Sequence, residues 1–390
     1  MRACPLCANP LPRLFFERRG VPVHQNRACP SAAEARQFRR GDLLLAFCPE
    51  CGFVFNSAFD PDLLNYSAAY ENTQTCSPHF QQYLSRLANS LLTKYDLRDK
   101  LVIEVGCGKG DFLRLLCKEG RNRGIGFDPT YIGPESIEAG AVRFVREFYG
   151  SKQMHYSPDF VCCRHVVEHL QSPLEMLRAV RRAISDRLTS IVFFETPALP
   201  WTLDSLSFWD LFYEHCSYFT AESLAWAFEQ TGFEVLEARP AFDEQYLHIE
   251  ARPAPTGSAR GKVRPQSGPD LWSKIQTFLA GLERRIEACE EKIDAFSRAG
   301  GCAIWGAAAK GATLANTMDP QNRRIPFLID INPAKQGKYV AGTGHPIVSP
   351  AHLKDRNGQV AGILNMNPNY LEENRMILSE MRLDIPILQL

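Results

Sequence analysis

A glycine-rich turn between an apolar run and a helical pattern constrains the fold of this chain most. Residues 101–105 read Leu-Val-Ile-Glu-Val, and Gly106, Gly108 and Gly110 follow before the amphipathic segment DFLRLLCKEG. Glycines at a strand-to-helix turn let a ligand approach the backbone, and free amides at the helix start favour an anionic group. We therefore expect a buried strand whose carboxyl end faces a ligand site.

An acidic residue follows this turn at the end of the next strand candidate. Asp128 ends the run GIGFD, about twenty residues beyond the turn, where a carboxylate can accept both hydroxyls of a ribose. The glycine spacing differs from the Gly-x-Gly-x-x-Gly of dinucleotide-binding folds. Together the turn and the acid indicate a cofactor that carries a nucleoside.

The pattern of apolar runs predicts two α/β regions. Between about residues 98 and 252 the strand candidates are LVIEVG, GIGFD, VRFV, DFVCC, SIVFFE and FEVLEA, separated by amphipathic stretches. This alternation is typical of a parallel sheet with helices on its faces. A second series, with CAIWGAAAKGATLAN, IPFLIDINP, GHPIV and VAGILNM, predicts a smaller α/β domain near the C-terminus.

A linker and a long helix separate the two regions. Residues 253–269 are rich in Pro, Gly, Ser and basic side chains, whereas residues 270–296 carry apolar side chains at spacings of three and four. The helix either packs on its own domain, which we favour, or forms a dimerising coiled coil. The expected units are 1–62 (metal-binding), 63–254 (cofactor-binding core), 255–298 (linker and helix) and 299–390 (C-terminal domain).

Two Cys-x-x-Cys pairs lie near the N-terminus and predict a metal site. Cys4 and Cys7 form one pair, and Cys48 and Cys51 form the other. Two such pairs supply the four thiolates of a tetrahedral structural Zn²⁺, which would stabilise a segment too small for an adequate core. A redox pair is the alternative. His24 and Cys29 lie between the pairs and are competing ligands.

Composition narrows the class of partner. The 44 basic and 44 acidic side chains cancel, and the pI is near 7.1, so no overall charge favours nucleic acid or an anionic membrane. No apolar run approaches the roughly 20 residues that span a bilayer. The 13 cysteines come without a secretory signal, which favours thiols and a metal site over disulfides. We expect a cytoplasmic monomer or homodimer with a small-molecule substrate.

Three segments of the central region resemble class I S-adenosylmethionine-dependent methyltransferases. They are EVGCGKGDFL, GFDP and CCRHVVEHL. The resemblance implies a Rossmann-like core in which the glycine turn holds the methionine part of the cofactor. By this resemblance the backbone of Gly106, Cys107 and Gly108 contacts the cofactor. Glu104 orients its amino group, Asp128 binds its ribose, and Arg164 or His165 lines the cofactor site. We interpret Glu168 and His169 as residues that pack this turn.

The order of the parts resembles one family more closely. A four-cysteine N-terminal domain, a methyltransferase core, a Glu-His motif and a C-terminal region with GAAAKGATLANT, DINPAKQGKY and NMNPNY are similar to the C-methyltransferases of nucleotide-linked deoxysugars. The resemblance implies a second, Rossmann-like C-terminal domain. It also implies transfer of a methyl group to carbon.

Carbon methylation requires a base that removes a proton beside a carbonyl to give an enolate. The segment FYEHCSYF, residues 212–219, concentrates such groups. His215 can accept a proton, and Glu214 can orient it or a substrate hydroxyl. Tyr213 or Tyr218 can stabilise an oxyanion. In the family resembled, the Glu-His pair belongs to the catalytic site.

Other residues are candidates for the rim of the site. Tyr66 and Tyr70 lie in a polar-aromatic segment that either closes over the ligands or packs on the core. Lys310, in Gly306-Ala-Ala-Ala-Lys-Gly, could meet a substrate diphosphate or belong to a scaffold. The chain departs from the sugar family at Phe212 and at residues 243–247, which puts the substrate in question. The alternatives are an O- or N-methyltransferase of a secondary metabolite and a non-catalytic cofactor-binding scaffold.

Overall fold

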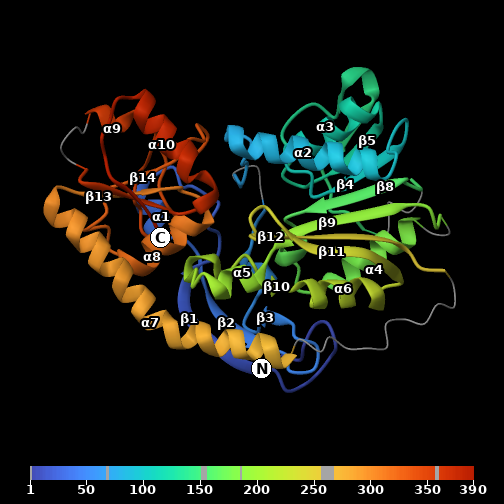
Figure 1. Ribbon diagram of the computed structural model, residues 1–390, viewed down its shortest axis with the longest axis horizontal. Coiled ribbons are helices and arrows are strands. Elements are labelled where there is room, and N and C mark those ends of the chain that lie inside the picture. Colours follow the sequence, from blue (N-terminus) through green and yellow to red (C-terminus); the bar gives the residue numbers. More distant parts are fainter. Residues whose placement is uncertain (1, 67–69, 151–155, 185–186, 256–267, 356–359) are drawn as a thin grey trace.

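A computed structural model describes residues 2–66, 70–150, 156–184, 187–255, 268–355 and 360–390. Within these ranges the chain builds three sheets, coloured from blue through green to red along the sequence in Figure 1. Most of the expected linker, residues 256–267, lies outside the described residues. None of the described helices is both long and apolar enough to cross a bilayer.

The central sheet has eight strands in the order β11-β12-β9-β8-β4-β5-β7-β6. Their bounds are β4 Leu101–Val105, β5 Arg123–Phe127, β6 Ser136–Ile137, β7 Val142–Val145, β8 Phe160–Arg164, β9 Ile191–Pro197, β11 Phe233–Ala241 and β12 Tyr246–Pro253. The five strands from β9 to β7 are parallel, whereas β12 runs antiparallel to both β9 and β11. This arrangement agrees with the Rossmann-like core that the resemblance to class I methyltransferases implies.

All six strands expected in this region are present, but the sheet is mixed instead of parallel. The expectation missed β12, whose sequence YLHIEARP carries His248 and Glu250. Both side chains are buried because they bond to Tyr83, Glu195, Lys94 and Tyr95 across the sheet face. Leu247, Ile249 and Ala251 alternate with these polar side chains and are buried on the other face of the sheet, so β12 is buried on both faces although its sequence alternates.

The C-terminal sheet is parallel throughout, in the order β15-β14-β13-β16-β17. Its strands are β13 Cys302–Trp305, β14 Leu328–Ile329, β15 Ile347–Val348, β16 Gly362–Asn365 and β17 Ile387–Gln389. The predicted turn GAAAK connects β13 to a helix. The strand and helix order matches the expected second α/β series.

The N-terminal sheet is antiparallel and includes one strand from the core. Its order is β1 Arg13–Pro22, β2 Arg40–Phe47, β3 Val54–Asn56 and β10 Ser217–Tyr218. Because β10 begins two residues after His215, the N-terminal sheet fixes one end of the segment that carries this residue.

Ten α-helices lie in the described residues. They are α1 Ala32–Arg36, α2 Pro78–Lys94, α3 Asp111–Gly120, α4 Pro173–Ile184, α5 Leu199–Asp204, α6 Ala221–Gln230, α7 Gly268–Ala299, α8 Ala309–Met318, α9 His352–Asp355 and α10 Leu371–Glu380. Figure 1 shows α7 running from the N-terminal sheet to the C-terminal domain. Its apolar face, including Leu271, Ile275 and Phe278, is buried against residues of the same chain.

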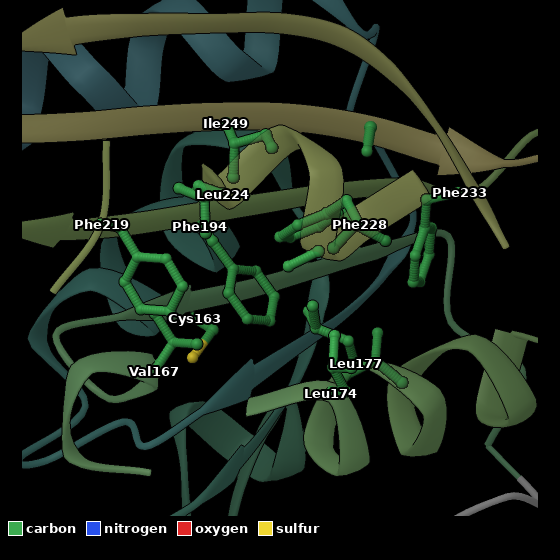
Figure 2. Packing of buried hydrophobic residues seen from close by; sticks show 14 of the residues in the cluster. Cys163, Val167, Leu174, Leu177, Phe194, Phe219, Leu224, Phe228, Phe233 and Ile249 are labelled. Atoms are coloured by element: carbon green, nitrogen blue, oxygen red, sulfur yellow. The ribbon is translucent and has the colours of Figure 1, made fainter. Parts of the chain in front are cut away.

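Two helices cover one face of the central sheet. Figure 2 shows Leu174 and Leu177 of α4 and Leu224 and Phe228 of α6 directed toward Phe194 of β9. The Phe194 and Phe228 rings meet edge to face, with centroids 5.1 Å apart. Fully burying a side chain of this size contributes about 1.5–3 kcal/mol, so this layer holds the carboxyl ends of the strands in place.

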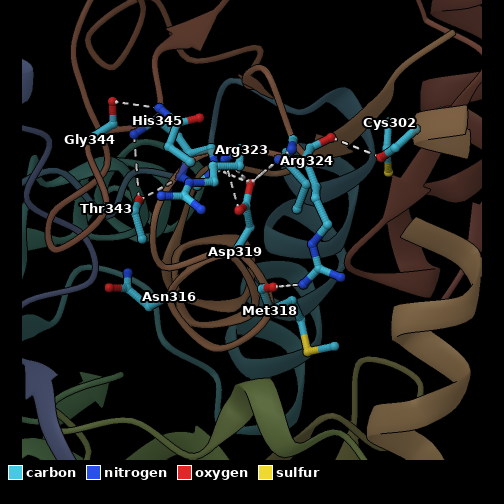
Figure 3. A network of polar contacts seen from close by, with 12 residues as sticks. Cys302, Asn316, Met318, Asp319, Arg323, Arg324, Thr343, Gly344 and His345 are labelled. Carbon is cyan, nitrogen blue, oxygen red and sulfur yellow. Dashed lines mark hydrogen bonds and ion pairs between the residues drawn. The ribbon is translucent and has the colours of Figure 1, made fainter. Parts of the chain in front are cut away.

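A buried carboxylate ends α8 in the C-terminal domain. Asp319 accepts hydrogen bonds from the amides of Arg323, Arg324 and Ile325, and His345 Nε2 lies 3.2 Å from it (Figure 3). Although burial opposes ionisation, these donors hold the pKa of Asp319 below its ordinary value. The network fixes α8, whose first turn reaches the site described next.

Candidate active site

One cavity of about 350 Å³ lies between the central sheet and the C-terminal domain. Its walls come from the carboxyl ends of β4, β8 and β9, from the β11–β12 hairpin and from the ends of β13, β14 and β16. Ligands of open α/β sheets bind at such strand ends. The cavity therefore faces the glycine turns of two α/β domains at once.

The first glycine turn is closely packed on one side and open on the other. Gly106 has φ +69°, and a Cβ placed there would meet Val166 Cγ2 at 2.1 Å, so a larger residue is excluded. Gly108 has φ +53°, and a Cβ placed there would have no described atom within 4 Å. Gly106, Cys107 and Gly108, the residues that the methyltransferase resemblance assigns to the cofactor, line the cavity.

Asp128 directly follows β5, beside this turn. Its Oδ2 accepts from the Gly108 amide at 2.8 Å, and its Oδ1 accepts from the amide and hydroxyl of Thr130 at 2.7 and 2.6 Å. Asp128 is not among the residues that line the cavity. A carboxylate has about four acceptor positions, so one remains after these three bonds.

Glu104 is the buried carboxyl at the base of the turn. Its Oε2 accepts from the Leu113 amide at 3.0 Å, and the side chain lines the cavity. Burial raises its pKa to about 8, against the opposing influence of Arg164. A ligand cation at this position would favour the carboxylate form.

Arg164 and His165 are both held by a carboxylate that the sequence analysis missed. Glu195 of β9 accepts from Arg164 Nε and Nη2 at 3.0 and 2.7 Å, and its carboxylate lies 2.9 Å from His165 Nε2. Burial disfavours the imidazolium, but Glu168 and Glu195 together raise the pKa of His165 to about 9. His165 therefore presents a positive charge to the cavity at neutral pH.

His215 lies in the cavity wall next to a second histidine. The rings of His169 and His215 are 4.8 Å apart and meet edge to face, and Glu168 also has a carboxylate oxygen within 4.8 Å of both. Burial and the neighbouring histidines hold the pKa of His215 well below its ordinary value. His215 is thus neutral, which a proton acceptor must be.

The tautomer of His169 follows from its contacts. Its Nδ1 lies 3.0 Å from the Glu214 carbonyl oxygen and 3.0 Å from the Tyr66 hydroxyl. Because a carbonyl can only accept, Nδ1 carries a proton. We expected His169 to pack the turn, but it also lines the cavity.

Two residues of the FYEHCSYF segment do not take the expected positions. The Glu214 side chain is fully buried and pairs with His24 Nδ1 at 2.5 Å and the Gln25 amide at 3.0 Å, so it does not orient His215. Tyr213 is also fully buried, and its hydroxyl bonds to the Asp60 backbone. The backbone of this segment directs both side chains away from the cavity that His215 faces.

Tyr218 of the same segment also does not take the expected position. Its hydroxyl donates to the Phe212 carbonyl at 3.1 Å and accepts from the Phe212 amide at 3.2 Å. The ring is buried in the core between the N-terminal sheet and α7. Since both capacities of its hydroxyl are used by the backbone, Tyr218 does not serve an oxyanion.

Of the residues expected at the rim of the site, some line the cavity and others do not. Tyr70 lines the cavity, whereas Tyr66 reaches it through the hydroxyl contact with His169. Lys310 lines the cavity from α8 and pairs with the half-buried Asp210 at 2.7 Å. Phe212 and Tyr246, from the two segments that depart from the sugar family, line it as well.

The four N-terminal cysteines come together. The sulfur atoms of Cys4, Cys7, Cys48 and Cys51 all lie within 4.8 Å of one another. Two sulfur pairs, Cys4–Cys51 and Cys7–Cys48, are 3.6 and 3.4 Å apart. A tetrahedral Zn–S bond of about 2.3 Å requires sulfurs roughly 3.8 Å apart, so the cluster fits this ion.

The two competing ligands lie elsewhere. His24 pairs with Glu214 and accepts the Asn65 amide at 3.0 Å through Nε2. Cys29 bridges to Tyr339 of the C-terminal domain through its backbone. Both are buried away from the cysteine cluster in positions fixed by long-range contacts, which spacing along the chain does not reveal.

Several residues in and around the cavity had at most a weak signal in the sequence. Glu195 ends the apolar run SIVFFE, and His248 lies in β12; the carboxylate and His248 Nε2 are 2.8 Å apart. Tyr246 meets His165 edge to face at 4.5 Å. An acid at the end of a buried strand candidate is the one cue that could have identified Glu195.

The fold and the cavity define a class I methyltransferase, and comparisons agree. The family described as "Methyltransferase domain" matches residues 78–238, and "C-methyltransferase C-terminal domain" matches residues 271–379. The C-methyltransferase NovU of Streptomyces niveus is 28% identical over 324 residues, which cover 78% of this chain and 75% of that protein. The chain is thus similar to C-methyltransferases over most of its length, and it is an S-adenosylmethionine-dependent methyltransferase.

Other similarities are confined to part of the chain. A tRNA U34 carboxymethyltransferase of Helicobacter pylori is 34% identical over 101 residues, or 23% of this chain and 39% of that protein. A 1,6-didemethyltoxoflavin N1-methyltransferase of Burkholderia thailandensis aligns over 45% of this chain and 80% of its own, with 16% identity and a TM-score of 0.34. A magnesium protoporphyrin IX methyltransferase of Synechocystis aligns over 45% and 84%, with 17% identity and a TM-score of 0.35.

Proposed function

We propose that this enzyme transfers a methyl group to a carbon atom beside a keto group of a nucleotide-linked sugar or a similarly oxygenated metabolite. The observation that carries the proposal is the pair of histidines, His169 and His215, in the wall of the cavity with ring centroids 4.8 Å apart. O- and N-methyl transfer act on nucleophiles with lone pairs, whereas carbon must first lose a proton to a base.

The cofactor residues suggested by the sequence fit S-adenosylmethionine, which supplies an electrophilic methyl group when bound. Glu104 is buried with its pKa raised to about 8, and the ammonium of the cofactor would compensate this carboxyl. Gly108 leaves open space for the methionine part. Asp128 keeps one acceptor position, and Arg164, His165 and Tyr70 line the same cavity.

Proton removal is assigned to His215, with His169 as its partner. His215 is neutral because burial and nearby cationic groups lower its pKa. When it accepts a proton, the Glu168 carboxylate within 4.8 Å would stabilise the imidazolium. The Tyr66 hydroxyl, 3.0 Å from His169 Nδ1, is our candidate donor to the enolate oxygen.

Glu214 contributes through its backbone in this proposal. Its carbonyl fixes the tautomer of His169, while its carboxylate holds His24 of the N-terminal sheet region. The residue therefore positions the catalytic segment and does not meet the substrate. This role explains why a Glu-His pair is useful even though the two side chains point apart.

We also propose that Cys4, Cys7, Cys48 and Cys51 bind a structural Zn²⁺. Four thiolates leave no open position for substrate, so the ion would stabilise the fold and take no part in methyl transfer. The cluster packs against the core through Phe53 and Phe55. Because β3 pairs with β10, loss of the ion would also loosen the segment next to His215.

Product analysis tests the proposed reaction. The enzyme would be incubated with S-adenosylmethionine carrying a ¹³C-methyl group and a nucleotide-linked 4-keto sugar, and the product analysed by NMR. A methyl carbon coupled to a ring carbon supports the proposal. A methyl group on oxygen or nitrogen would instead support the alternative methyltransferase classes, and cofactor binding without turnover on any candidate would support a scaffold.

A further inference from the structure

A second cavity lies where the N-terminal sheet, the catalytic segment and α8 meet. Its volume is about 140 Å³, well above the roughly 10–15 Å³ that one water requires. Three groups of residues line it. They are Arg18, Arg19, Gly20, Val21, Pro22, Gln25 and Arg40 from the N-terminal region, Leu211 and Phe212 from the turn that leads to His215, and Thr313, Asn316 and Thr317 from α8.

Three buried polar atoms of this lining have no hydrogen-bond partner among the described residues. They are Arg18 Nη1, Gln25 Oε1 and Thr313 Oγ1. Gln25 and Thr313 are only 6% and 7% exposed. Buried polar groups are almost always paired, so three unpaired ones around one cavity indicate a missing ligand.

The charges of the lining are unbalanced. Arg19 pairs with Glu17 and Asp42, and Arg40 donates to the carbonyls of Gly20 and Gly342 at 2.7 and 3.0 Å. Within the described part of the chain, the Arg18 side chain has neither a carboxylate nor a carbonyl partner. Its guanidinium lies over the Phe16 and Phe208 rings, 5.4 and 5.5 Å from their centroids. Burial lowers its pKa to about 10, so Arg18 remains charged at neutral pH. A half-buried cation whose buried Nη1 has no partner favours an anion beside it.

The hydrogen-bonding character of the cavity identifies the anion further. Gln25 Nε2 donates to the Pro22 carbonyl at 2.7 Å, which fixes Oε1 as the group that faces a partner. Gln25 thus accepts, Arg18 donates, and the Thr313 hydroxyl can do both. A fitting ligand has both negative charge and a hydrogen to donate.

We propose that this cavity binds inorganic phosphate in its protonated forms, with Arg18 and Thr313 donating to the ionised oxygens and Gln25 accepting from the P–OH group. Sulfate has the same shape but no proton at neutral pH, so the site should distinguish the two. Phe212 lines this cavity and the active-site cavity. A bound ion would therefore brace the segment that carries His215.

Phosphate binding to the full-length, zinc-loaded protein tests the proposal. Thermal unfolding and calorimetric titration would be carried out with inorganic phosphate, sulfate and glycerol 3-phosphate, with sodium chloride holding the ionic strength constant. We expect phosphate to stabilise the protein more than sulfate does. Glycerol 3-phosphate should bind more weakly, since the cavity has little room beyond the ion. Tighter binding of the ester would overturn the assignment to the free ion.

Two variants and one control locate the binding. Arg18→Gln should weaken phosphate binding at least about tenfold, the loss of a charged hydrogen bond. Thr313→Val keeps the side-chain shape, so it remains informative if Arg18→Gln fails to fold, and it should weaken binding severalfold. Arg13→Gln, on the exposed part of the same strand, should bind as the parent does. Equal affinity for phosphate and sulfate, or parental affinity in Thr313→Val, would overturn the proposal.

Discussion

The amide of Gly108 donates a hydrogen bond to Asp128 Oδ2 at 2.8 Å, and this bond ties the first glycine turn to the end of the neighbouring strand. The C-terminal domain repeats the relationship, since the Ala307 amide donates to Asp330 Oδ2 at 3.0 Å. Each acid follows the strand beside the turn. The cavity lies between two versions of one strand-turn-acid arrangement, of which only the first has the methyltransferase pattern.

The two matching acids, Asp128 and Asp330, provide a test of which turn binds the cofactor. Asp128→Asn keeps an acceptor for Gly108 but removes the charge, and it should weaken binding of S-adenosylhomocysteine by about 1.5–3 kcal/mol, the range for a hydrogen bond to a charged group. Asp330→Asn is the matched control and should leave that affinity unchanged. Isothermal titration calorimetry measures both. An equal loss in the two variants would mean that the C-terminal turn shares the cofactor.

Glu104 should make cofactor binding depend on pH. Its folded-state pKa of about 8 means that the carboxyl is mostly protonated at pH 7. If the cofactor ammonium stabilises the carboxylate, binding should release about 0.9 protons per site at pH 7. Affinity should therefore rise with pH and level off above about pH 8.

Titration in two buffers of different ionisation enthalpy counts these protons. Glu104→Gln cannot ionise, so it should bind more weakly and release no proton. The same carboxyl also affects stability: because its folded pKa lies above the unfolded value, the parent should lose stability as pH rises from about 4.5 to 8. A parental proton count in Glu104→Gln would contradict the assignment.

The cysteine cluster makes a prediction about metal content. Cys48→Ser should lower the zinc bound from about one equivalent per chain and lower the unfolding temperature, since metal binding and folding are coupled in so small a unit. Cys29→Ser changes a buried cysteine outside the cluster and should keep the metal. Atomic absorption after gel filtration gives the ratio. A redox pair would instead show a thiol count that changes with reductant and no bound zinc.

Glu214 should affect stability more than chemistry. Glu214→Ala leaves His24 Nδ1 and the Gln25 amide buried without a partner, and removing one member of a buried pair costs about 3–5 kcal/mol. Glu214→Gln should keep most of the rate in its folded fraction, because the backbone carbonyl that bonds His169 is unchanged. Denaturant unfolding and initial rates separate the two effects. A fully stable Glu214→Gln with a hundredfold lower rate would refute the positioning role.

The fold was predictable where residues adjacent in sequence act together. The glycine turn, the six core strands and the long helix all have local periodicity or turn chemistry, and the cysteine pairs carry their own spacing. The packing partner of helix α7 was harder to predict, because an apolar face of this kind can form either a coiled coil or part of a core within one chain. Its burial against Phe16 and Leu199 reflects tertiary packing that periodicity alone does not contain.

The site was predictable only in part, since side-chain direction depends on distant partners. His215 and Glu214 are neighbours in sequence, yet one faces the cavity and the other meets His24 of the N-terminal region. Glu195 of β9 and His248 of β12 are opposite each other in neighbouring strands, and their side chains are in contact. The sequence of β9 is an apolar run, whereas that of β12 mixes apolar and polar residues. Such pairings arise from register, which the linear pattern of these strands does not specify.

The central claim is that His215 removes a proton from the carbon to be methylated. The measurement is solvent deuterium exchange at the α-carbon of a nucleotide-linked 4-keto sugar in the presence of S-adenosylhomocysteine, which allows proton removal and prevents methyl transfer. His215→Ala should slow exchange by about 100-fold or more, in keeping with general-base contributions of roughly 10²–10⁴, while S-adenosylhomocysteine affinity and stability stay near those of the parent. Exchange as fast as in the parent would contradict the claim and leave His169 and Tyr66 as the next groups to test.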